Sequence, residues 1–319
     1  VYNRCIAYTH LGASMSTQLS PAQHRLAHDY LSAHARPLEK ALYQVRMQGA
    51  SPDLVINALA PYQNADGGFG KALEPDIRLS DSSVIATTVA LQHLREISAS
   101  ADLPIVQNAC QYLVDTYDDV QQAWHIIPAN VDDAPHAPWW TYDADITKNY
   151  ANPRAEILGY LYDFPENFPA DMREKLTQAV MNYLLVHDDE MEMHDIQCYV
   201  RLLETETLPE ASRQAMLPKM RAILQHNVDT DPAKWSDYGL PPLAVVSSPE
   251  SPFYDLFADA IPANIQFVID TQTDDGYWQP AWSWDFVDEN AWAQAEKAWR
   301  GVLTVNNLRT LAHFNALPD

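Results

Sequence analysis

Apolar residues recur with the spacing of an α-helix over most of this chain. Leu38, Ala41, Leu42 and Val45 lie at positions i, i+3, i+4 and i+7, which places them on one face of an amphipathic helix. Together with a helix around Leu26, the same kind of pattern predicts further helices at about 55–62, 82–94, 104–117, 153–161, 172–183, 190–205, 210–226, 262–271 and 297–315. No segment alternates as a strand would. We therefore expect an all-α protein of about ten to twelve helices.

Capping residues predict where several of these helices begin. Asp81 is placed to cap the helix at 82–94, and Asn152 followed by Pro153 is typical of a cap and a first-turn proline. The run from Trp299 to Gly301 is expected to open the last helix, in a structural role.

Two long irregular segments, 124–151 and 228–254, interrupt the helical pattern. Both are rich in Trp, Tyr and Leu, so we interpret them as functional loops or lids, not as domain linkers. We expect one domain over residues 15–319. Because Met15 followed by Ser16 and Thr17 is typical of a natural start, we expect residues 1–14 to be an extension outside the fold.

Composition and charge exclude several classes. The chain has 20 Lys and Arg against 43 Asp and Glu, and the net charge of −23 argues against a nucleic-acid partner. Nine glycines are too few for Gly-rich phosphate loops or many tight hairpins. Three cysteines, Cys5, Cys110 and Cys198, form no disulfide framework, and no stretch matches a signal peptide or membrane span. A cytoplasmic protein is expected.

One motif occurs twice, each time directly after a predicted helix. Residues 63–69 are QNADGGF and residues 272–278 are QTDDGYW, so both contain Gln, then Asp-Gly three residues later, then an aromatic residue. Asp-Gly favours a tight turn, and the aromatic ring can pack back against it. We interpret Gln63, Asp66, Gln272 and Asp275 as residues that fix the two turns.

This repeat resembles the QxxDGxW motif of the terpenoid cyclase and protein prenyltransferase superfamily. The resemblance implies an α/α toroid, in which an inner ring of helices surrounds a central cavity, and it implies an isoprenoid-handling enzyme. The repeat residues of that superfamily are structural, so they do not themselves identify a reaction.

Two chemistries of that superfamily can be sought in this sequence. Protonation-initiated cyclases carry a DxDD acid motif, and its nearest counterparts here are Asp143 with Asp145 and Asp229 with Asp231, both without the fourth acid. Confinement in a dry cavity would raise the pKa of one member of such a pair, so Asp143 and Asp145 are candidate acids. The alternative is a solvated pair that caps its own loop.

Prenyltransferases instead hold zinc with Asp, Cys and His. His194 and Cys198 lie at i and i+4 on a predicted helix and are the candidate zinc ligands, but no third ligand is evident. Residues 188–192, DDEME, are similar to a magnesium-binding box, but an acidic first turn of a helix explains them better. The sequence requires no cofactor.

Aromatic and acidic residues gather in two irregular stretches that predict a ligand site. The first contains His136, Trp139, Trp140, Asp143, Asp145 and Glu156, and the second contains Trp278, Trp282, Trp284 and Asp285. Glu74 and Asp76, just after the first repeat, add candidate catalytic carboxyls. Such residues stack on sugar rings beside an acid and a base, or stabilise a carbocation. The alternative is that the rings pack the loops onto the helices and His136 is an ordinary loop histidine.

Three functions therefore remain open. The resemblance favours an isoprenoid-handling enzyme. The carboxyl groups also suit a carbohydrate-active α/α barrel, and a non-catalytic toroid that binds a peptide or small ligand is the third possibility. The expected ligand is small and apolar or sugar-like.

Overall fold

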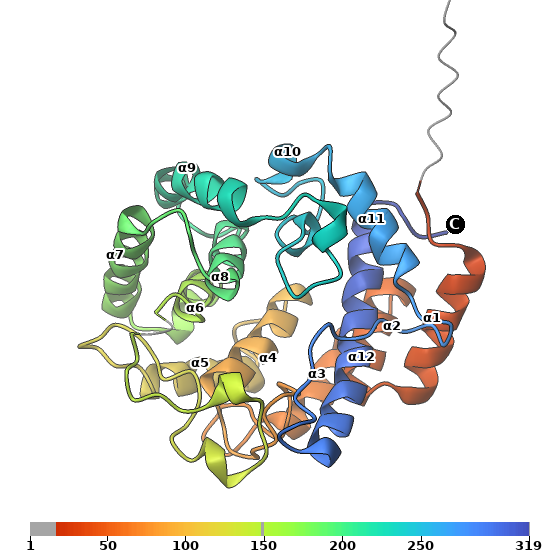
Figure 1. Cartoon of the computed structure of the whole chain (residues 1–319). Coiled ribbons are helices and arrows are strands. Elements are labelled where there is room, and N and C mark those ends of the chain that lie inside the picture. Colours follow the sequence, from red (N-terminus) through yellow and green to blue (C-terminus); the bar gives the residue numbers. More distant parts are fainter. Residues whose placement is uncertain (1–16, 148–149, 319) are drawn as a thin grey trace, which may run out of the picture.

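The computed structural model describes residues 17–147 and 150–318, and in these ranges the chain is all-helical (Figure 1). The expected extension, residues 1–14, lies outside them. The described residues contain no β-strand beyond isolated bridges. Their twelve α-helices are α1 (Pro21–His34), α2 (Pro37–Gln48), α3 (Asp53–Leu59), α4 (Val84–Glu96), α5 (Pro104–Asp115), α6 (Arg154–Asp163), α7 (Ala170–Val186), α8 (Met193–Leu203), α9 (Glu210–Asn227), α10 (Tyr254–Phe257), α11 (Ile261–Asp270) and α12 (Glu289–His313).

Three predicted helix starts are wrong. Ser83, and not Asp81, caps α4, because its hydroxyl accepts a hydrogen bond from the Ala86 amide at 3.1 Å. Asn152 does not cap α6, which follows a cis Asn152–Pro153 bond and begins at Arg154. Helix α12 begins at Glu289 after an Asp288 cap, so Trp299 lies inside that helix and not at its start.

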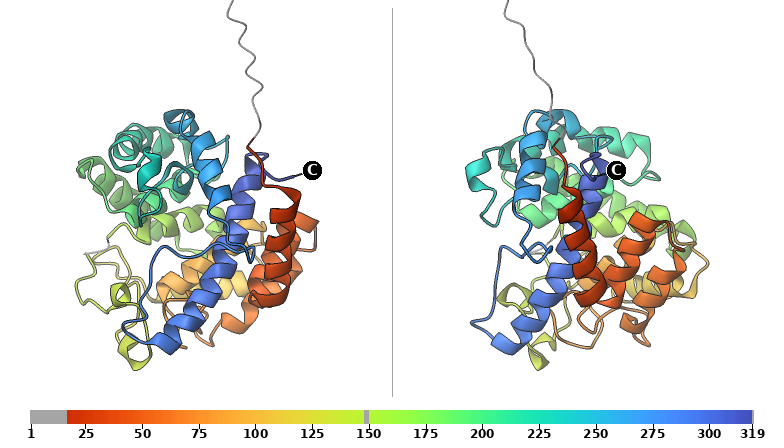
Figure 2. Two further views of the ribbon diagram at one scale, coloured as in Figure 1. Left: turned by 45° about the vertical axis from the view of Figure 1, so that its right-hand side comes forward. Right: turned by 90° about the vertical axis from the view of Figure 1, so that its right-hand side faces the viewer.

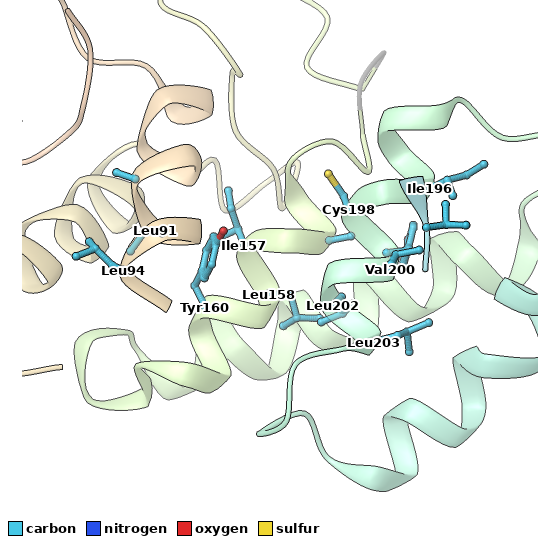
Figure 3. Packing of buried hydrophobic residues seen from close by; sticks show 14 of the residues in the cluster. Leu91, Leu94, Ile157, Leu158, Tyr160, Ile196, Cys198, Val200, Leu202 and Leu203 are labelled. Atoms are coloured by element: carbon cyan, nitrogen blue, oxygen red, sulfur yellow. The ribbon is translucent and has the colours of Figure 1, made fainter. Parts of the chain in front are cut away.

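Helix α6 is the most deeply buried helix segment, because every residue from Arg154 to Leu161 is buried. It contacts α4 on one side and α8 on the other, and these three helices share a core of Leu, Ile and Tyr side chains (Figure 3). Helices α7 and α9 pack against α6 and α8 from outside (Figure 1). The periodic apolar faces therefore account for most of the packing.

The last helix packs against the first two helices of the chain. Helix α12 contacts both α1 and α2, and it runs beside α1 in Figures 1 and 2. Gly301 lies where these helices meet, and a Cβ there would be in van der Waals contact, at 3.4 Å, with the side chains of Ala35 and Glu39. The Leu19 amide also donates to the Ala316 carbonyl at 2.8 Å. Segments almost 300 residues apart are thus joined.

The two repeats form the same hydrogen bonds. Gln63 Nε2 donates to the Gly67 carbonyl at 2.9 Å and to the Ile105 carbonyl at 3.0 Å. Gln272 Nε2 donates to the Gly276 carbonyl and to the Gln23 carbonyl, both at 3.0 Å. Each glutamine therefore closes its own turn and reaches a second helix, α5 or α1.

Other features of the repeats also correspond. Gly67 and Gly276 have φ of 89° and 91°, which only glycine adopts without strain. In each repeat, the backbone amide of the aromatic residue donates to a threonine hydroxyl on the following long helix. Phe69 donates to Thr87, and Trp278 donates to Thr304. Asp66 accepts from the Gly68 amide and the Ser82 hydroxyl. For Asp275, no hydrogen bond is described.

Among the described helices, none has both the length and the apolar composition needed to cross a bilayer.

Candidate functional site

The segment between the first repeat and α4 places two carboxyl groups in the interior, those of Glu74 and Asp76, which are 7% and 2% exposed. Their segment begins in a strained backbone. Lys71 and Ala72 have φ of 53° and 60°, a conformation that costs non-glycine residues about 1–2 kcal/mol each. The Arg36 guanidinium fixes it by donating to the Ala72 carbonyl at 2.9 Å. Strain held in this way is common at functional sites.

Backbone hydrogen bonds bring the loop 124–151 to the same segment. The Ala137 amide donates to the Asp76 carbonyl at 2.9 Å, and the Arg78 amide donates to the Pro135 carbonyl at 3.0 Å. The loop thereby places Trp140 in an apolar cluster with Trp282, Trp284 and Trp299. Parts of the two aromatic stretches singled out in the sequence thus meet beside Asp76.

Three tryptophan side chains donate hydrogen bonds to Asp76. Its Oδ1 accepts from Nε1 of Trp284 at 2.7 Å and of Trp299 at 2.8 Å, and its Oδ2 accepts from Nε1 of Trp282 at 3.2 Å. Hydrogen-bond donors directed at a carboxyl group favour its ionised form. Asp76 is therefore equipped to carry a negative charge in the interior.

Glu74 has weaker compensation, since its Oε1 accepts only a long hydrogen bond, at 3.4 Å, from the Asp76 amide. Desolvation is the largest cause that raises its pKa to about 8, and the charge of Asp76 raises it further. Desolvation raises the pKa of Asp76 as well, but the three indole N–H groups act in the opposite direction. At neutral pH we accordingly place the proton on Glu74 and the charge on Asp76.

Partly exposed aromatic rings surround this carboxyl pair. Trp282 packs edge-on against Trp299, with ring centres 5.0 Å apart, and against Tyr238, at 5.5 Å. Trp282 and Trp299 are half-buried, so their rings remain partly accessible. The buried Trp140 Nε1 forms no hydrogen bond within 3.5 Å in the described residues, but it lies close enough to Glu74 to lower the pKa of that carboxyl group.

A second buried carboxylate, Glu156, lies where α6 faces α8. Its Oε2 accepts a hydrogen bond from Arg201 Nη1 at 2.9 Å, and its Oε1 accepts one from the Tyr160 hydroxyl. The Cys198 thiol lies 3.9 Å from Oε2 and 3.6 Å from Asn152 Oδ1. Desolvation and then the charge of Glu156 raise the pKa of Cys198 well above its ordinary value, so it is an unreactive thiol.

Arg201 reaches this cluster from α8. Its side chain is 37% exposed, and its guanidinium pairs with the buried carboxylate of Glu156. Although desolvation lowers the pKa of Arg201, the charge of Glu156 and other neighbours raise it overall. The ion pair therefore joins a buried carboxylate to a partly exposed cation.

Ion pairs also join helices that face one another. Glu96 of α4 pairs with both Arg46 of α2 and Arg309 of α12. Arg36, the residue before α2, contacts Glu39 of α2 at 2.6 Å. Arg46 and Glu39 are largely buried. Helix α4 is therefore joined to α2 and to α12 partly through paired charges.

Asp143 and Asp145 lie on the surface, where both are exposed. Asp143 accepts the Asp145 amide at 2.9 Å, and Asp145 accepts the amide and hydroxyl of Thr147. They line a shallow depression of about 40 Å³ together with Trp139, Trp140 and other residues of 124–146. The dry enclosure that would raise the pKa of one of them is not present there.

The remaining candidates have local roles. His136 Nδ1 lies 3.0 Å from the Ala134 carbonyl, and Asp285 is an exposed residue that accepts from the Ser283 hydroxyl. Trp278 is buried in the main core and donates to the Val268 carbonyl at 2.7 Å. Trp139 is 49% exposed. None of these four is hydrogen-bonded to the carboxyl pair.

The two candidate zinc ligands have different partners. The His194 ring is hydrogen-bonded to Glu192 and Tyr238, whereas the Cys198 thiol faces Asn152 and Glu156. Across the described residues, no group of three or more His, Cys, Asp or Glu side chains is placed to hold a metal ion. In the acidic run 188–192, Asp189 pairs with Lys219, and Glu192 caps α8.

Sequence reasoning missed Trp299, Tyr238 and Arg201. Trp299 is assigned a structural role on its position in a helix, but its indole N–H reaches Asp76 across 223 residues. Tyr238 lies in the second irregular segment, whose aromatic content was a usable signal. No sequence signal points to Arg201, because an arginine on a helix is ordinarily solvated.

Neither the comparison with protein-family models nor the comparison with curated proteins finds a match for this sequence.

Proposed function

We propose that this protein is an acid–base enzyme in which Glu74 is the general acid and Asp76 its ionised partner. The observation that carries the proposal is the carboxyl group of Asp76, which accepts three indole N–H groups beside a buried Glu74. Pairs of carboxyls whose environments separate their pKa values are the usual acid and base of an active site. A pKa of about 8 keeps Glu74 protonated at neutral pH and ready to donate.

The proposed substrate is a sugar or a similar polyhydroxylated molecule. Flat rings such as Trp282 and Trp299 stack on sugar faces, and both indoles also bond Asp76, so a ligand stacked on either lies close to the carboxyl pair. A protonated Glu74 would donate to the oxygen of the leaving group.

Acid-initiated isoprenoid chemistry is the second candidate. It is favoured by the two repeats, whose matching hydrogen bonds support the resemblance to terpenoid cyclases and prenyltransferases. For this reaction too, Glu74 and not Asp143 or Asp145 would be the acid, with tryptophan rings stabilising the cation.

The proposed architecture is an α/α toroid. Helices α4, α6 and α8 make successive contacts, and α12 contacts α2. In the second repeat, Gln272 links the end of α11 to α1. In the first repeat, Gln63 links the segment after α3 to α5 in the same way. This pattern supports closure of the helices into a ring.

A substrate screen tests the function. Purified protein is incubated with a panel of oligosaccharides and aryl glycosides and, separately, with prenyl diphosphates and squalene. We expect turnover of at least one sugar, and a loss of roughly 10³-fold in kcat for Glu74→Gln, because general acid catalysis contributes about 10² to 10⁴. Asp143→Asn is the matched control and should retain activity.

Each other outcome identifies an alternative. Turnover of an isoprenoid but of no sugar would mean that the substrate is an isoprenoid. Binding of a ligand without turnover would favour the non-catalytic toroid. Full activity in Glu74→Gln would contradict the assignment of the acid.

A further inference from the structure

Three polar side chains form a continuous chain next to Trp282. Glu192 Oε1 lies 2.7 Å from His194 Nδ1, and His194 Nε2 lies 3.0 Å from the Tyr238 hydroxyl. Glu192 and His194 belong to the start of α8, whereas Tyr238 comes from the irregular segment 228–254. Two separate elements therefore meet at the histidine.

The direction of these hydrogen bonds follows from Glu192. Its Oε2 accepts the backbone amides of His194 at 2.7 Å and Asp195 at 3.3 Å, which favours an ionised carboxylate. An ionised carboxylate can only accept, so the proton of a neutral His194 lies on Nδ1. The Nε2 atom then has only a lone pair, and the Tyr238 hydroxyl must donate to it.

Tyr238 belongs to the same site as the carboxyl pair. Its ring packs edge-on against Trp282, whose indole donates to Asp76. Burial and then the charge of Glu192 raise the pKa of Tyr238 to about 12, and the charge of Asp76 adds to this, although Tyr238 is 55% exposed. Its proton thus points away from the carboxyl pair and towards a histidine, while its oxygen keeps a free lone pair.

We propose that Tyr238 and His194 together act as the general base of this site, with Tyr238 relaying the proton that His194 accepts, and that Glu192 is their positioning residue. The inference rests on the proposed function. A water proton moves to the Tyr238 oxygen as the proton of Tyr238 moves to His194 Nε2, and Glu192 stabilises the imidazolium. The water oxygen forms a bond to the sugar carbon, the bond from that carbon to the leaving oxygen breaks, and the leaving oxygen takes the proton of Glu74. Solvent then removes the proton from His194 and returns one to Glu74.

This arrangement has the form of a base held by a third group, as in other activated sites. Other ionisable groups near the histidine are Asp195 in the same turn of α8 and His187 after α7, which interacts with Asp195. Neither is hydrogen-bonded to the His194 ring in the described residues, so Glu192 sets its tautomer.

The first test needs no substrate. Nitrogen-15 NMR of the full-length protein should show His194 as the Nδ1–H tautomer, and Glu192→Gln should introduce the Nε2–H tautomer. Tyr238→Phe should shift the Nε2 resonance. A wild-type His194 protonated on Nε2 would overturn the relay, whatever the protein acts on.

The second test uses a sugar that the screen identifies. Tyr238→Phe should lower kcat by about 100-fold or more, with KM changed less than about threefold, because general base catalysis contributes about 10² or more. His194→Gln should lower kcat similarly, and the double variant no further, since the two act as a unit. Tyr254→Phe, whose ring stacks on Phe314, is the control for loss of a tyrosine hydroxyl.

The two failures can be separated. If Tyr238→Phe keeps its kcat, or changes KM alone, Tyr238 only packs its loop and the inference is wrong. If no sugar is turned over, the proposed function fails and the general-base role falls with it, while the tautomer still decides whether the hydrogen-bonded chain exists.

Discussion

Two pairs of acidic residues in this protein have the same spacing and opposite surroundings. Asp143 and Asp145 lie at i and i+2 on the surface, where they organise their own loop. Glu74 and Asp76 also lie at i and i+2, but both are buried, and Asp76 accepts three indole N–H groups. An identical spacing therefore yields a loop cap in one place and a candidate acid in the other.

The difference teaches that burial of a carboxyl group, and not the spacing of the pair, raises its pKa enough for it to act as an acid near neutral pH. In water two neighbouring carboxyls ionise near their ordinary pKa, whereas desolvation disfavours the charged form. The indole donors then decide which member of the buried pair keeps its charge. Substitutions at the buried pair should therefore have measurable effects, and matched substitutions at the exposed pair serve as their controls.

The largest expected effect is on stability when the buried acceptor is changed. Asp76→Asn places an amide N–H₂ where indole N–H groups need an acceptor, so the free energy of unfolding should fall by about 2–3 kcal/mol. Urea denaturation measures this. Asp145→Asn, at the exposed pair, should change it by less than about 0.5 kcal/mol. Equal effects in the two variants would remove the distinction between the pairs.

The second prediction concerns pH. The folded-state pKa of Glu74, about 8, exceeds that of the unfolded chain, so its contribution to stability is fully present below the unfolded pKa and is lost as pH rises through 8. Between pH 6 and 9 this contribution should fall by about 2–3 kcal/mol, given an unfolded pKa near 4.3. Glu74→Gln should lack this part of the slope, and Asp145→Asn should keep it. A wild-type slope in Glu74→Gln would place the raised pKa elsewhere.

The smallest effect should come from a single indole donor. Trp299→Phe removes one of three hydrogen bonds to Asp76 and keeps most of the ring, so a loss of about 1 kcal/mol is expected in thermal or urea unfolding. Trp139→Phe, at a half-exposed ring beside the other pair, should be close to neutral. A neutral Trp299→Phe would show that Trp282 and Trp284 suffice.

The helices could be predicted from the sequence because their apolar faces repeat every three to four residues. The prediction of an all-α protein is confirmed for the described residues, and α9 and α11 agree with the expected ranges to within a residue. Helix α12 begins eight residues before its predicted start, because its first turns pack Trp292 and Ala295 on a separate small cluster and not on the main core. The spacing of apolar residues cannot show whether a residue packs on this small cluster or on the main core.

The site was predictable only in part. Glu74, Asp76, Trp282 and Trp284 were named from their residue types in irregular segments, and the structure brings them together. Which acidic pair is buried could not be known, because burial of Asp76 depends on residues more than 200 positions away. The positions of Tyr238 and Arg201 likewise follow from contacts between distant elements.

The second repeat also bears on how the protein unfolds. Gly276 fits against the backbone of Leu26 and Ala27, where an added Cβ would lie 2.3 Å from a carbonyl carbon, and Gln272 donates to the Gln23 carbonyl. The first helix cannot detach without also opening a turn 250 residues later. Amide hydrogen exchange in α1 should therefore report on the C-terminal third of the chain, as one cooperative unit.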